Sequence, residues 1–174
     1  MEMSYSQIFE EAMSLCFQKN AEGKIIPNPE AMGIVGFCFM KGYGTAKDEE
    51  KAFNLLSMAA NLGHVESMCN LAQCYIDGIG TEIDEEKGFY YYKQAVDLGY
   101  IDAYLGLSMC YMLGKGTAKD FDEAFYYCNK AVDLGSVPAL SGLADCYEHG
   151  IGTIKNLEKA EKLRLEYNKK MGNI

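Results

Sequence analysis

The sequence predicts an all-α protein in which antiparallel helical hairpins stack as an α-solenoid. Two observations predict this fold class: a Gly-x-Gly-Thr element recurs at a constant spacing, and the segments between its copies carry apolar residues at helical spacing. The chain has 174 residues, of which 49% are apolar, and this is enough to bury a core. We therefore expect a folded chain that forms one continuous domain.

The repeat is defined by the Gly-x-Gly-Thr elements at Gly42, Gly78, Gly114 and Gly150, which lie 36 residues apart. Other positions keep the same step: Ala31, Ser67, Ala103, Ala139; Val35, Leu71, Leu107, Leu143; Phe39, Tyr75, Tyr111, Tyr147; and Ala52, Gly88, Ala124, Ala160. This register predicts four repeats, over residues 31–66, 67–102, 103–138 and 139–174. Residues 1–30 are expected to form a capping helix and a linker.

The first helix of each repeat, helix A, is predicted from Ser67 to Gly78 and at the equivalent residues of the other repeats. Small and apolar side chains at relative positions 1, 5, 8, 9 and 12 form one stripe of an α-helix. Glycine readily takes the left-handed conformation that ends a helix. Helix A should therefore end at Gly42, Gly78, Gly114 and Gly150.

The second helix, helix B, is expected to begin after Asp48, Asp84, Asp120 or Asn156, whose side chains can accept a hydrogen bond from the free amides of a helix start. Glycine at 63, 99 and 135 should end it. The small residue at Ala52 and its equivalents predicts a close contact between the two helices. Because a lone hairpin cannot bury both faces, the repeats are expected to stack into one core.

These residues resemble the Sel-one-like repeats (SLR), relatives of the tetratricopeptide repeats. The third repeat matches the family pattern at Ala103, Leu107-Ser108, Tyr111, Gly114-Lys115-Gly116, Asp120, Ala124, Tyr127, Ala131 and Gly135. The resemblance implies a right-handed superhelix. It also implies a scaffold or adaptor that binds a peptide segment or partner protein on its concave surface.

Both ends depart from the repeat. A capping helix is expected from Tyr5 to Lys19, followed by a linker that proline keeps from being helical. In the fourth repeat Glu161 replaces the phenylalanine of the other three, and Tyr167, Lys170 and Met171 replace the closing alanine, leucine and glycine. A polar outer face of this kind is expected of a terminal cap.

A candidate binding groove follows from the helical geometry. Helix-A positions 3, 7 and 10 lie roughly opposite the stripe that packs on helix B, and related solenoids line their concave surface with this side. The candidate partner-binding residues are Phe37, Met40, Gln73, Ile76, Leu105, Met109, Met112, Asp145 and Glu148. Methionine and phenylalanine suit an adaptable surface, and the acidic end suits basic flanking residues. The alternative, packing of these side chains against the neighbouring helix A, stays open.

Other functions are disfavoured by the composition. A net charge of −9 repels nucleic acid and anionic membranes, and no apolar run is long enough for a membrane span. With no export signal and an odd number of cysteines, seven, we expect a monomeric cytoplasmic protein with free thiols. The Gly-x-Gly loops lack the lysine of a phosphate-binding loop.

We expect no enzyme, cofactor or metal site. Cys146 and His149 have the spacing of a metal-binding pair, but no second pair lies near them. The cysteines that recur at Cys38, Cys74, Cys110 and Cys146 suggest a ladder of disulfides, yet neighbouring helices are too far apart for one. Two alternative functions remain: a hydrolase-like activity, as suggested for cysteine-rich relatives, or a self-associating structural module.

Overall fold

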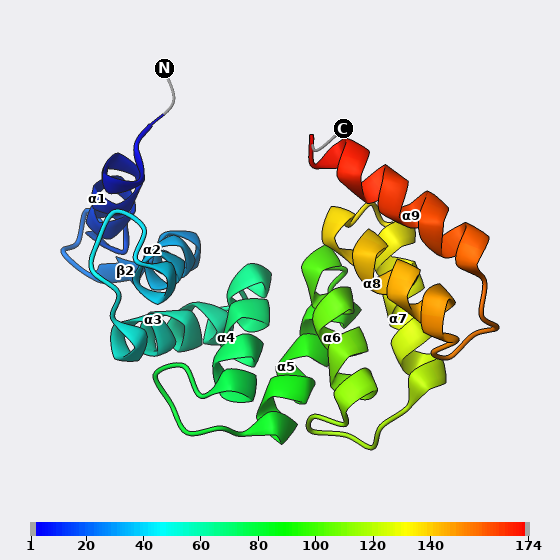
Figure 1. The fold of residues 1–174 in the computed structure, drawn as a ribbon. Helices are drawn as coiled ribbons and strands as arrows, with labels where there is room; N and C mark the ends of the chain where they lie inside the picture. Colours follow the sequence, from blue (N-terminus) through cyan, green and yellow to red (C-terminus); the bar gives the residue numbers. More distant parts are fainter. Residues whose placement is uncertain (1–2, 173–174) are drawn as a thin grey trace. The chain divides into compact units, whose positions relative to one another are not determined.

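The computed structural model describes residues 3–172, so residues 1–2 and 173–174 of the expected end segments lie outside the described residues. The chain folds into two compact units, Met1–Tyr91 and Tyr92–Ile174, here called the N-terminal and C-terminal units (Figure 1). The elements are α1 (Tyr5–Leu15), β1 (Phe17–Lys19), β2 (Ile25–Pro27), α2 (Pro29–Lys41), α3 (Glu49–Asn61), α4 (Val65–Asp77), α5 (Glu85–Asp97), α6 (Ile101–Leu113), α7 (Phe121–Asp133), α8 (Val137–His149) and α9 (Leu157–Lys170).

The predicted helix pairs are present in all four repeats. Helix A corresponds to α2, α4, α6 and α8, and helix B to α3, α5, α7 and α9. Helix A packs on helix B of the same repeat in the pairs α2 and α3, α6 and α7, and α8 and α9. The prediction of an all-α helical-repeat solenoid is confirmed, whereas the expectation of one continuous domain stays a prediction.

The predicted helix caps are confirmed. Asp48, Asp84 and Asn156 each accept a hydrogen bond, at 2.9 to 3.0 Å, from the amide three residues further on. Asp120 accepts two, at 3.0 Å, from amides of the first turn of α7. Glycine ends each helix A in the left-handed conformation, with φ between 71° and 75°. Local hydrogen bonding therefore sets the helix boundaries.

The small residue of helix B lies where helix A approaches most closely, as predicted. Ala52 and Ala124 are fully buried. The Ser108 hydroxyl on α6 donates a 2.6 Å hydrogen bond to the Ala124 carbonyl. A Cβ at Gly88 would lie 2.5 Å from Cγ1 of Ile76. Larger side chains at these positions would separate the two helices.

The second glycine of the Gly-x-Gly loop has a role that the sequence did not reveal. Gly80 and Gly152 have positive φ angles, of 67° and 59°. A Cβ at Gly80 would collide with the backbone carbonyl of Glu49, and one at Gly152 with that of Phe121. These carbonyls belong to the first residues of α3 and α7. The loop of one repeat thus lies against the start of helix B in the repeat before it.

The first helix is shorter than predicted. The helix expected from Tyr5 to Lys19 ends at Leu15, and β1 follows, paired antiparallel with β2. In the turn between the strands, Asn20 Oδ1 accepts hydrogen bonds from two backbone amides, at 2.9 and 3.0 Å. This local bonding overrides the helical spacing of the apolar residues. The segment before α2 is non-helical, as predicted, and Pro29 is the first residue of α2.

Pairs of parallel tyrosine rings join helix A to helix B. In the N-terminal unit, Tyr75 and Tyr91 stack with ring centroids 5.9 Å apart and an angle of 4° between the planes. In the C-terminal unit, Tyr111 and Tyr127 stack at 5.7 Å and 3°. Burial raises the pKa of Tyr91 and Tyr127. The aromatic positions of the repeat therefore belong to the packing of the hairpin.

Candidate functional site

The expected exposure of two candidate residues in the N-terminal unit is wrong. Met40 and Ile76 are only 4% and 8% exposed. Met40 lies in a buried cluster with Ala52, Leu56 and Cys74, and Ile76 packs on Gly88. Both occupy position 10 of helix A, which in α2 and α4 faces the small residue of the helix B in its own repeat. They belong to the core of the hairpin.

The other two candidate residues of this unit reach solvent but contact their own chain. Phe37 is half-buried and lies edge-on to Tyr43, with ring centroids 6.0 Å apart, and the Lys41 amine lies 5.9 Å from its ring centre. Gln73 is exposed, and its Nε2 donates a 2.8 Å hydrogen bond to Asp77. Because Met40 and Ile76 are buried, the apolar groove predicted from the sequence does not continue through this unit.

The C-terminal unit presents a more continuous apolar surface on α6. Met109 is 52% exposed, and Leu105 and Met112 are half-buried. Two residues that the sequence analysis missed extend this surface, since Ile101 is 40% and Leu113 53% exposed. At about 100° per residue all five fall within one third of the helix circumference. We call Ile101, Leu105, Met109, Met112 and Leu113 the α6 apolar face.

The missed residues carried a sequence signal. The predicted groove included positions 3, 7 and 10 alone, although Ile101 and Leu113 lie on the same side of the helix. Position 3 has a second role: Leu105 lies 3.9 Å from where a Cβ on Gly142 of α8 would be. In the N-terminal unit a Cβ on Gly33 would likewise meet the Ser67 hydroxyl of α4, at 2.6 Å. Position 3 therefore also packs toward the next helix A, as the open alternative had it.

The acidic candidates on α8 are held by an arginine of α9. Asp145 and Glu148 are half-buried, and Arg164 Nη2 donates to both, at 2.9 Å to Asp145 Oδ1. These bonds, with that to Asp145 the larger contribution, raise the pKa of Arg164. Arg164 occupies the position of Leu56 and Cys128 in earlier repeats, where the side chain is buried. The charge of the expected acidic surface is thus partly offset within the chain.

The cysteines contribute to the packing of the repeats. Six of the seven are buried, Cys69 is half-buried, and none forms a disulfide within residues 3–172. Burial raises the pKa of Cys74 to about 11, so this thiol stays protonated at neutral pH. The Cys128 thiol has its pKa raised by its hydrogen bond to Cys146 and by burial. Their chemistry is that of small apolar core residues.

Within residues 3–172, no three His, Cys, Asp or Glu side chains come together in a way that could hold a metal ion. His64 Nδ1 lies 2.8 Å from the Ser67 hydroxyl, where it ties the start of α4, and the exposed His149 is in the last turn of α8. No helix in the described part of the chain has the length and apolarity to cross a bilayer.

The Sel1 repeat model matches four successive segments, residues 29–64, 65–100, 101–136 and 137–163. These boundaries agree with the observed starts of helix A, two residues before the predicted ones. The fourth match ends inside α9, where the sequence departs from the repeat. No curated protein sequence matches the chain.

Solved structures of the same fold share little sequence with this chain. A Sel1 repeat protein from Oxalobacter formigenes has a TM-score of 0.77 at 23% identity, covering 93% of this chain and 64% of its own. The protective antigen c5321 of uropathogenic Escherichia coli, which displays an SLR fold, has a TM-score of 0.73 at 21% identity, covering 97% of this chain and 34% of its own.

Cysteine rich protein B of Helicobacter pylori has a TM-score of 0.56 at 23% identity, covering 77% of this chain and 93% of its own. The chain spans about a third of the length of the E. coli structure and 64% of the Oxalobacter one. Because all three identities are below 25%, these structures establish the fold alone. The in-register helix pairs and the four matched segments together place this chain in the Sel1 repeat family.

Proposed function

We propose that this protein is a scaffold or adaptor that binds a segment of another protein on the α6 apolar face. Sel1 repeats are generally protein-interaction modules, and that general role supports the proposal. The observation that carries it is the exposure of Met109 and Leu113, at 52% and 53%, on one side of a well-formed helix. Adjacent exposed apolar residues of this kind are typical of surfaces that a partner covers.

The chemistry of the α6 apolar face suits an unspecialised peptide partner. Methionine is flexible and polarizable, so Met109 and Met112 can adapt to partner side chains of different shape. Leucine and isoleucine at the edges supply apolar area without a polar atom that would need a partner. We expect an amphipathic helix or an extended apolar segment to bind here. This replaces the longer groove expected from the sequence with a shorter one.

A photo-crosslinking amino acid in place of Met109 tests the proposal in extracts of the source cells. The expected result is a covalent adduct with one or a few polypeptides. The adduct should be lost when Leu113→Glu is added, because the carboxylate is costly to desolvate in an apolar contact. Leu113 is exposed, so the substitution should change the stability by less than ~0.5 kcal/mol.

The matched control carries the same photo-crosslinker in place of Ile154. This side chain is also apolar, lies in the C-terminal unit and is 88% exposed, but it belongs to the loop before α9. It should give no comparable adduct. The same adducts from both positions, or none from Met109, would rule out docking on α6.

A further inference from the structure

Helix α1 has the contacts of a helix B, although the sequence offset hides this. Phe9 lies edge-on to Phe39, with ring centroids 5.3 Å apart at 87°, and Phe53 of α3 lies edge-on to Tyr75 at 5.4 Å and 88°. A Cβ at Gly44 would collide with the carbonyl of Tyr5, the first residue of α1. Gly80 meets the first residue of α3 in the same way.

This equivalence aligns α1 with α3 at an offset of 44 residues, eight more than the repeat, because β1 and β2 are inserted after α1. Ile8 then corresponds to Ala52, the small residue that packs on helix A. Ala52 is fully buried, whereas Ile8 is 36% exposed. Within residues 3–172, no helix A covers this face of α1.

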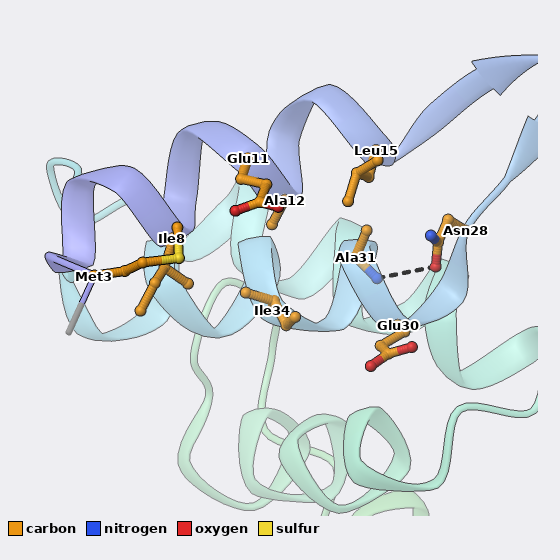
Figure 2. A pocket seen from close by; sticks show the side chains of 9 residues that line it. All are labelled: Met3, Ile8, Glu11, Ala12, Leu15, Asn28, Glu30, Ala31 and Ile34. Carbon is orange, nitrogen blue, oxygen red and sulfur yellow. Dashed lines mark hydrogen bonds between the residues drawn. The ribbon is translucent and has the colours of Figure 1, made fainter. Parts of the chain in front are cut away.

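A pocket of about 290 Å³ lies between α1 and α2 at this uncovered face (Figure 2). Its apolar lining residues are Met3, Ile8, Ala12, Leu15, Ala31 and Ile34. Ala31 and Ile34 are positions 1 and 4 of helix A. In later repeats the equivalent residues contact the helix A of the repeat before: Ser67 of α4 lies against Gly33 of α2, and Gly142 of α8 lies against Leu105 of α6. The pocket is therefore part of the site that a preceding helix A would occupy.

Two carboxylates flank this apolar lining. Figure 2 shows Glu11 on the α1 side and Glu30 at the start of α2. Both are exposed, and neither forms an ion pair within the part of the chain that the structure describes. An apolar partner that also carries lysine or arginine would gain two charge contacts here.

We propose that this pocket binds an amphipathic helix of a partner protein, with an apolar stripe flanked by basic residues, in the position that a preceding helix A occupies in the other repeats. The repeat gives the form of the occupant, since the same surface of other repeats is covered by a helix. Glu11 and Glu30 give its charge. A volume of about 290 Å³ holds only a few side chains, so the rest of the partner helix would lie along the surface.

The pocket is a second surface, independent of the α6 apolar face, and its test uses defined probes. The basic probe is a labelled synthetic peptide of about 15 residues, with leucines at helical spacing and lysines on their flanks. The acidic probe has glutamate in place of lysine. Fluorescence anisotropy should show the full-length protein binding the basic probe at least ~10-fold more tightly than the acidic one.

Reversing the pocket's charges should reverse this preference. The double variant Glu11→Lys, Glu30→Lys should bind the acidic probe more tightly than the basic one. The matched control, Glu10→Lys, Glu66→Lys, makes the same change in net charge on the same helix α1 and at the repeat equivalent of Glu30. It should keep the wild-type preference, which separates the pocket from a general effect of the acidic chain.

The apolar part is tested by Ile34→Asp, which should weaken both probes about tenfold or more while leaving the helical circular dichroism unchanged. Leu113→Glu on α6 should leave both probes unaffected, so the failure of either surface is recognisable separately. Equal binding of the two probes, or a reversal in the control variant, would overturn the proposal. So would sedimentation showing a wild-type dimer that Ile34→Asp dissociates, because the occupant would then be a second copy.

Discussion

The helices α1 and α9 lie at opposite ends of the repeat register and expose opposite chemistry. On α9, Lys162 pairs with Glu158 at 2.6 Å, Lys170 pairs with Glu166 at 2.9 Å, and Arg164 holds two carboxylates of α8. Beside α1, Ile8 and Ile34 are 36% and 38% exposed, and the nearby carboxylates have no ion-pair partner within residues 3–172.

The difference shows that two helices of one repeat protein can expose surfaces of opposite polarity. A polar outer face is what a terminal cap needs, and α9 carries ion pairs within its own repeat. Arg164 replaces the buried residue that stacks on the next repeat elsewhere. The polar residues expected in repeat four are therefore exposed on α9, whereas its role as a cap stays a prediction. The flank at α1 keeps the apolar character of a stacking surface, which is why a partner is expected there.

The strongest test of the repeat contacts is Gly152→Ala. Gly152 has a φ of 59°, and a Cβ would lie 2.6 Å from the carbonyl carbon of Phe121. The backbone must shift, so we expect a loss of at least ~3 kcal/mol in the free energy of unfolding, measured with urea. Gly135→Ala is the control, because its φ of 93° carries a similar backbone cost but nothing lies within 4 Å. Equal losses would show that the loop contact contributes nothing.

The same substitution beside α1 should act locally. In Gly44→Ala, a Cβ would lie 2.6 Å from the Tyr5 carbonyl carbon, so α1 must move away from the loop. We expect amide hydrogen exchange in α1 to become faster, because the free energy of local opening should fall by about 1–2 kcal/mol. Exchange in α4 should stay unchanged. Gly63→Ala, with a φ of 88° and no atom within 4 Å, should leave α1 protected. A loss of protection throughout the N-terminal unit would show that the contact of Gly44 with Tyr5 supports more than α1.

At α9 the effect should be smaller, because the charges are exposed. Arg164→Ala leaves Asp145 and Glu148 without their cation, but the Arg164 side chain is 48% exposed. We expect a small loss in the free energy of unfolding, measured with urea, that decreases with added salt. Lys162→Ala removes one pair within α9 and should reduce the stability less than Arg164→Ala does. If Arg164→Ala lowers the free energy of unfolding no more than Lys162→Ala does, the ion pairs between α8 and α9 contribute no more than a pair within α9.

The smallest effect concerns the titration of α9. The hydrogen bond and charge of Lys162 hold the pKa of Glu158 below its ordinary value. The pair therefore stabilises the fold above the ordinary glutamate pKa, and this contribution is lost as the pH falls through the lowered value. Carboxyl NMR titration should show the lowered pKa, and Lys162→Ala should return it towards the ordinary one. An unchanged pKa in the variant would show that the pair does not persist in solution.

Local signals made the repeat predictable from sequence. The caps at Asp48 and Asn156 and the helix-ending glycines depend on residues a few positions apart, so their spacing is enough to predict them. The burial of Met40 and Ile76 depends on which neighbouring helix a side chain meets, and the angle around a single helix does not contain that information. Most of the α6 apolar face was found, because exposure there follows the helix period.

The N-terminal segment was harder to predict for two physical reasons. Phe17 continues the apolar spacing of α1, so the spacing alone extended the helix into β1. The hairpin then shifts α1 by eight residues from the 36-residue register, and this hides its equivalence to helix B. Phe9 was the available signal, because an offset of 44 residues aligns it with Phe53 of α3.

The stacked tyrosines give each compact unit a spectroscopic signature of its own. The chain has 13 tyrosines and no tryptophan, so its near-ultraviolet signal is dominated by phenol rings. Parallel rings less than 6 Å apart couple their electronic transitions, and both the Tyr75–Tyr91 and the Tyr111–Tyr127 pairs meet that condition. The difference between the near-ultraviolet spectra of the wild type and of a variant with one pair replaced by phenylalanine isolates the signal of that pair, so its loss on heating reports the melting of the unit that contains it.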